Sequence, residues 1–109
     1  MPSSPIHPGE ILKDELAAID MNAAQLARSI HVPANRISQI VAGKRNISAD
    51  TALRLGKLFN TGPQFWLNLQ VAYELDLAKE SGVADLSAII PYSAALHSEL
   101  AAMLAHGQK

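Results

Sequence analysis

Apolar side chains recur at helical spacing in five stretches between residues 8 and 80. Such spacing places each apolar set on one face of a helix, and we expect these faces to pack together in one core. The sets are Ile11, Leu12, Leu16 and Ile19; Leu26, Ala27 and Ile30; Ile37, Ile40 and Val41; Ala52, Leu53, Leu55, Leu58 and Phe59; and the aromatic-rich run from Phe65 to Leu77.

Residues typical of helix ends bound these stretches. Proline suits a first helical turn, Asn, Ser and Thr are good N-caps, and glycine suits the position just past a helix. We expect the first helix to end near Ile19, Gly43 to stop the third, and Ser81–Gly82 to end the fifth. The predicted starts are Pro8 with Glu10, an Asn22–Gln25 capping box, Pro33 in a first turn, Ser48 with Asp50, and a Thr61–Gln64 capping box.

Residues 22–45 predict two short helices joined by a tight turn. Helices joined so closely cross steeply, as in a helix-turn-helix, and the small Ala27 suits a close crossing. The second helix, predicted over Pro33–Ala42, keeps Ala34, Asn35, Arg36, Ser38 and Gln39 on its outer face. Arg pairs well with guanine, and Asn or Gln with adenine, in a major groove.

A polar outer face is also what a merely solvated helix shows. The tight turn and the basic pair Lys44–Arg45 after the second helix favour DNA recognition instead. Arg54 and Lys57 lie three residues apart on the next helix, where phosphate contact and a solvated face both remain open.

The fifth predicted helix is apolar on more than one side. In a small domain this favours one face on the core and another at an interface with a second copy or a partner. Beyond it, the apolar run within Val83–Tyr92 fits a short strand or a short helix. A last amphipathic helix is predicted from Ser93, with Leu96, Leu100, Met103 and Leu104 on one face.

Charge is unevenly distributed along the 109 residues, whose net charge is −1. Residues 22–60 carry six basic side chains against one acidic, whereas the segments on either side are each net −3. The basic charge is therefore concentrated where the helix-turn-helix is predicted, as expected for a DNA-binding segment.

Several function classes are disfavoured by what the sequence lacks. It has no cysteine, no Gly-rich phosphate loop, no catalytic motif and no apolar run long enough to span a bilayer. His7 near Glu10 fits a helix cap or a surface residue better than a metal ligand. We expect no enzymatic activity, no metal and no cofactor, no membrane association, and a cytoplasmic location without a signal peptide.

The helix-turn-helix resembles the Xre/Cro/C1-type repressor domain, and the chain is more narrowly similar to the HigA family of antitoxins over roughly residues 6–78. The resemblance implies a homodimer that binds a palindromic operator in its own promoter, and a RelE-like ribonuclease toxin, HigB, as partner. It implies base contacts from Asn35, Arg36 and Gln39, and backbone contacts from Ser38, Lys44 and Arg45. The matching stretches are His7–Leu12, Val32–Ile40, Gly43–Arg45, Ser48–Leu55 and Gly62–Gln70, the last being the most specific.

We therefore predict an all-α chain: a five-helix Xre/lambda-repressor-like helix-turn-helix bundle with a C-terminal helical extension. The expected division is a flexible tail at 1–6, a DNA-binding domain at 7–80 and the extension at 81–109. Two alternatives remain, a stand-alone Xre-type repressor without a toxin and a protein-interaction module that no longer binds DNA. The basic central segment argues against the second.

Overall fold

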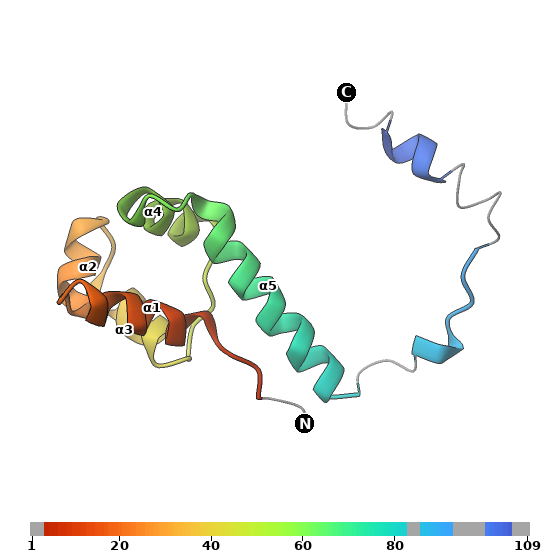
Figure 1. Cartoon of the computed structure of the whole chain (residues 1–109), viewed down its shortest axis with the longest axis horizontal. Helices are drawn as coiled ribbons and strands as arrows, with labels where there is room; N and C mark the ends of the chain where they lie inside the picture. The colour runs from red at the N-terminus through yellow and green to blue at the C-terminus, as the bar shows by residue number, and fades with distance from the viewer. Residues whose placement is uncertain (1–3, 83–85, 93–99, 106–109) are drawn as a thin grey trace.

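The chain folds into five α-helices that pack around one core, as the computed structural model shows for residues 4–82, 86–92 and 100–105 (Figure 1). No strand occurs in these described ranges, and the prediction of an all-α, five-helix bundle is confirmed. The helices are α1 (Pro8–Ala18), α2 (Ala23–Ser29), α3 (Ala34–Val41), α4 (Ala49–Phe59) and α5 (Pro63–Glu80). A short 3-10 helix, η1 (Leu86–Ala88), follows.

The core is formed by all five helices together with the loop between α3 and α4. Trp66 is its largest fully buried side chain, and its ring packs 5.6 Å from that of Phe59 and 5.0 Å from that of Phe65, between ring centroids. The Trp66 Nε1–H donates to Thr61 Oγ1 over 3.1 Å, so the one polar atom of the indole is satisfied. The buried apolar residues are Leu12, Leu16, Leu26, Ala27, Ile30, Ile37, Ile40, Ile47, Ala52, Leu55 and Trp66.

Most of the predicted helix ends are confirmed. Pro8 opens α1 at its first position, and Asn22 and Gln25 form a reciprocal capping box at α2 with both hydrogen bonds at 2.8 Å. Gly43 follows α3 with a φ of +76°, the left-handed conformation that glycine adopts without strain.

The predicted capping box at α5 is wrong. The N-cap is Gly62 rather than Thr61, because the chain turns there with a φ of +82° and leaves Thr61 outside the helix. The Thr61 hydroxyl instead accepts the Trp66 N–H, and the Gln64 amide donates to Asn68 over 3.2 Å.

Three residues predicted to pack inward are exposed. Ile19 is 47% exposed because α1 ends at Ala18 and the backbone turns before the third position of the stripe reaches the core. Leu53 is 60% and Leu58 38% exposed. The face of α4 that packs on α5 is made by Ala52, Leu55, Gly56 and Phe59, which leaves both leucines on the outer side.

Beyond α5 the chain leads away from the bundle (Figure 1). Of the two structures left open for the apolar run before Tyr92, the short helix is found, as η1, and Leu86, Ile89, Ile90 and Tyr92 are all exposed. Residues 100–105 are helical, in agreement with the predicted last helix, whose start and Leu96 lie outside the described residues. None of the described helices is long and apolar enough to cross a membrane.

Helices α1 and α3 approach closely at Gly9, which is buried. A Cβ atom at Gly9 would overlap the backbone carbonyl oxygen of Ile40, and backbone cannot move aside as a flexible side chain can. The absence of a side chain at Gly9 therefore sets how near α3 lies to the start of α1.

Replacing Gly9 with Ala is expected to lower the free energy of unfolding by about 2 kcal/mol or more, because overpacking outweighs the better helix propensity of alanine. Urea unfolding followed by circular dichroism measures the change. Asp14→Ala, on the exposed side of α1, is the matched control and should alter stability by less than about 0.5 kcal/mol. A Gly9→Ala variant as stable as the parent would show that α1 and α3 can separate freely.

His7 caps α1, one of the two roles that the sequence left open, and it is buried rather than on the surface. Its Nδ1 accepts the Gly9 N–H over 2.9 Å, its ring lies 4.8 Å from that of Tyr73, and the Glu10 carboxylate accepts the His7 N–H over 3.3 Å. Burial lowers the pKa of His7 from its ordinary value of 6.5, against the opposing effects of Glu10 and the Arg45 backbone. Protonation would also place a hydrogen on Nδ1 and remove the acceptor of the cap.

Because the folded-state pKa is lowered, the unfolded chain binds the proton more readily, and the stability present above pH 6.5 is lost as the pH falls below that value. We expect the free energy of unfolding to decrease as the pH is lowered from about 7.5 to about 5.5. In His7→Asn, which keeps an N-cap acceptor but does not titrate, this fall should be smaller. Equal pH dependence in the two proteins, measured by urea unfolding, would contradict the assignment.

Candidate nucleic-acid interface

A three-residue turn connects α2 to α3. After the C-cap Ile30, His31 takes a left-handed conformation with a φ of +61°, and the Val32 N–H returns to the Ala27 carbonyl over 3.0 Å. Pro33 is extended and serves as the N-cap of α3 rather than lying in its first turn. The helix therefore spans Ala34–Val41, one residue shorter at each end than predicted.

The buried side of α3 consists of Ile37 and Ile40, both fully inaccessible to solvent. Asn35 and Ser38 are exposed on its other side, and Arg36 and Gln39 are partly exposed. Lys44 and Arg45 follow the helix and are exposed. The structure thus brings all six predicted contact residues together on α3 and the segment directly after it.

Gln39 and Arg45 are joined by a hydrogen bond. The Arg45 Nε–H donates to Gln39 Oε1 over 2.8 Å, so the amide oxygen of Gln39 is occupied. Bidentate reading of adenine requires both the oxygen and the amino group of a glutamine. In this arrangement Gln39 offers its amino donors, and the Arg45 side chain is directed toward α3.

Arg36 pairs with an acidic residue that the sequence did not link to it. The Arg36 Nη1 lies 2.9 Å from Asp50 Oδ2, and the Arg54 Nε lies 3.0 Å from the same oxygen. The hydrogen bond from Arg54, followed by that from Arg36, holds the pKa of Asp50 below its usual value. Asp50 and Arg54 are four residues apart on α4, a visible helical pairing, but Arg36 and Asp50 are fourteen apart and meet only in the fold.

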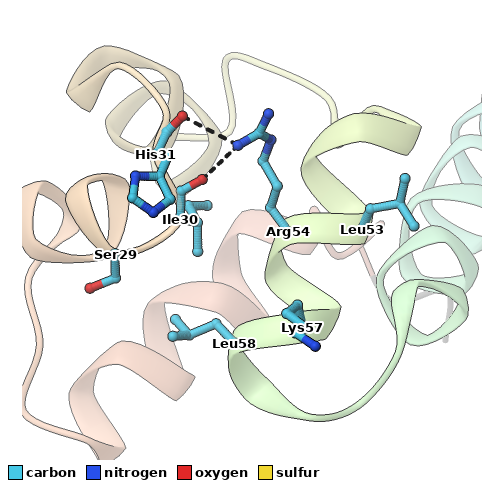
Figure 2. Close-up of a pocket in the computed structure, with 7 residues that line it drawn as sticks. All are labelled: Ser29, Ile30, His31, Leu53, Arg54, Lys57 and Leu58. Carbon is cyan, nitrogen blue, oxygen red and sulfur yellow. Dashed lines mark hydrogen bonds between the residues drawn. The ribbon is translucent and has the colours of Figure 1, made fainter.

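Arg54 also contacts the end of α2. Its Nη1 donates to the Ile30 carbonyl over 2.8 Å and to the His31 carbonyl over 3.3 Å (Figure 2). These are carbonyls at a helix C-terminus, which a cation stabilises. The Arg54 guanidinium is therefore more than a solvated side chain, since it binds protein through Nε and Nη1 while the side chain is 39% exposed. A phosphate contact by Arg54 stays a prediction.

Arg54 lies at the edge of a shallow pocket between α4 and the end of α2 (Figure 2). Its volume is about 390 Å³, and its lining combines aliphatic with polar and basic side chains. In the described part of the chain, no three His, Asp or Glu side chains are grouped so that they might hold a metal ion. The lining residues are Ser29, Ile30, His31, Leu53, Arg54, Lys57 and Leu58.

A short helix, a tight turn and a second helix with a polar outer face, supported by three further helices, define a helix-turn-helix domain of the Xre type. Residues 12–66 match the helix-turn-helix family HTH_3. The chain is 47% identical over 89 residues to Virulence-associated protein I of Dichelobacter nodosus, covering 81% of this chain and 82% of that protein.

Two solved structures are similar in both sequence and fold. A HigA-family addiction-module antidote protein from Coxiella burnetii is 52% identical, with a TM-score of 0.77 across 83% of this chain and 100% of that chain. Antitoxin HigA of Pseudomonas aeruginosa, determined with the higBA promoter, is 46% identical, with a TM-score of 0.74 across 82% and 99%. The chain belongs to the HigA family of helix-turn-helix proteins, a family of DNA-binding regulators and antitoxins rather than enzymes.

Proposed function

We propose that this protein is a sequence-specific DNA-binding antitoxin that represses its own promoter and neutralises a RelE-like ribonuclease toxin of the HigB kind. The observation that carries the proposal is the polar face of α3, which lies in a basic segment of a HigA-family fold. The similar Pseudomonas aeruginosa antitoxin, whose structure includes promoter DNA, supports promoter binding by this chain.

In this proposal α3 enters the major groove. Asn35, Arg36 and Gln39 face base edges, and Ser38, Lys44 and Arg45 contact the phosphate backbone. The donors that Arg36 and Gln39 present match the two acceptors of guanine, O6 and N7, better than the mixed edge of adenine. We therefore expect guanines in the part of the operator that these two side chains read.

A homodimer would place two copies of α3 about 34 Å apart, one turn of DNA, on a palindromic operator. Exposed apolar side chains on α4 and α5 support association of the chain with another. The side chains of Leu53 and Phe65 are 60% and 41% exposed although both helices contribute to the core. These apolar side chains are therefore available for contact with a second copy.

The C-terminal half of α5 is the surface we assign to the toxin. Val71 and Leu75 are exposed there on one helical face, and Leu77 is exposed on another. The same half of the helix carries Glu74, Asp76 and Glu80 against one basic residue, Lys79. Exposed apolar side chains in a net acidic segment are complementary to a basic protein, and an RNA-cleaving toxin needs basic surface to hold its substrate. Binding at this surface leaves the side chains of α3 available for DNA.

Replacing Arg36 with Ala is expected to weaken binding to the promoter duplex by roughly 1–3 kcal/mol and to relax base preference, whereas Lys44→Ala should weaken binding to all sequences alike. The latter should also reduce the salt slope by about one unit, because one phosphate contact is lost. Fluorescence anisotropy with the promoter duplex and a scrambled duplex, over a range of salt concentrations, measures both effects. Unchanged affinity and preference in Arg36→Ala would show that α3 reads DNA by another face.

Affinity purification of the chain from its native cells is expected to recover one stoichiometric small basic protein that cleaves RNA once separated. Recovery of promoter DNA without such a protein, from cells shown to express any adjacent small gene, would favour a stand-alone repressor. If the chain showed no salt-sensitive binding to DNA, a protein-interaction module would be favoured instead.

A further inference from the structure

We propose that Asp50 is a specificity-determining residue, which positions Arg36 for base recognition and restrains it from contacting the phosphate backbone. The inference rests on the proposed function, because it concerns how α3 reads DNA. It names a residue that lies outside α3 and carries the opposite charge to DNA, so it is not expected among the DNA contacts themselves.

The first step is the placement of Arg36 by Asp50. Asp50 Oδ2 lies 2.9 Å from Arg36 Nη1, and the Arg36 side chain is 29% exposed while that of Asp50 is 56% exposed. A free arginine at a helix surface samples many rotamers and loses that freedom on binding. The ion pair fixes one edge of the guanidinium before DNA arrives and leaves its remaining N–H donors for a base.

The second step is the placement of Asp50 itself. Arg54 Nε holds the same Oδ2 atom at 3.0 Å, and Arg54 Nη1 donates to the carbonyls of Ile30 and His31 (Figure 2). The position of Asp50 is thereby linked to the C-terminal end of α2 as well as to α4. One carboxylate oxygen therefore connects α2, the recognition helix α3 and α4.

The third step is electrostatic. A carboxylate beside a DNA-reading surface repels phosphates, so Asp50 lowers affinity for DNA of any sequence. Arg36 held by Asp50 also contributes less free positive charge to non-specific binding. The ion pair is expected to reduce non-specific affinity more than operator affinity, because only the operator offers the base that the fixed guanidinium fits.

Asp50→Asn is the direct test, since asparagine keeps the shape of the side chain but removes its charge. We expect affinity for a scrambled duplex to rise and its salt dependence to steepen by up to about one unit. We expect the ratio of affinities for the promoter duplex and the scrambled duplex to fall by about tenfold, within the range set by a single mismatched base pair.

The matched control is Asp14→Asn, which removes an exposed carboxylate from α1 and so gives the same net charge. Its affinity ratio should stay within about twofold of the parent protein. In an Arg36→Ala background, Asp50→Asn should change the ratio by no more than about twofold, because Asp50 acts through Arg36.

Arg54→Lys provides a second variant if Asp50→Asn fails to fold. Lysine pairs with Asp50 but lacks the second group that reaches the α2 carbonyls, so the ratio should fall in the same direction and by less. Thermal unfolding of every variant separates loss of fold from loss of preference.

The proposal is overturned if Asp50→Asn keeps the parent affinity ratio, or if it lowers the ratio equally with and without Arg36. Absence of sequence preference in the parent protein is a different outcome, which refutes the proposed function before Asp50 is considered.

Discussion

The crossing of α2 and α3 is the constraint on which the rest of the structure depends. Only His31, Val32 and Pro33 lie between the C-cap of α2 and the first residue of α3, and His31 adopts a left-handed conformation to make the turn. Ala27 is buried at the crossing, where a larger side chain would push the helices apart. Once Ile37 and Ile40 are buried, Asn35 and Ser38 can only face outward.

Local chemistry was the predictable part of this molecule. Helix caps depend on residues two or three positions apart, and helical stripes on residues three or four apart. Both can therefore be recognised from residues that are close together in the sequence. The Asn22–Gln25 box and the buried face of α3 follow directly. The Thr61 cap failed because the chain turns at Gly62, which becomes the N-cap and leaves the Thr61 hydroxyl to accept the Trp66 N–H.

The sequence predicted which side chains form the candidate site, but it did not predict the hydrogen bonds and the ion pair that orient them. The members of the site follow one another along α3 and the segment directly after it, whereas the hydrogen bond between Gln39 and Arg45 and the pairing of Arg36 with Asp50 of α4 form only in the fold. The same limit applies to Gln70, a buried polar side chain that accepts the Ile47 N–H over 2.8 Å and ties that loop to α5. Hydrogen bonds across twenty or more residues have no periodic signature in a single sequence.

The second half of α5 exposes apolar side chains to contact with another protein chain. Its last ten residues, after the buried Gln70, extend about 15 Å at the helical rise. Val71, Leu75 and Leu77 on this half are exposed. A helical segment with few core contacts of its own gains stability when another chain covers its exposed apolar side chains. A partner that binds only the folded helix stabilises it by mass action, in proportion to the logarithm of its concentration over its dissociation constant. Under the proposed function, the order of this half of α5 is expected to depend on partner concentration, while the helix-turn-helix draws its stability from the core around Trp66.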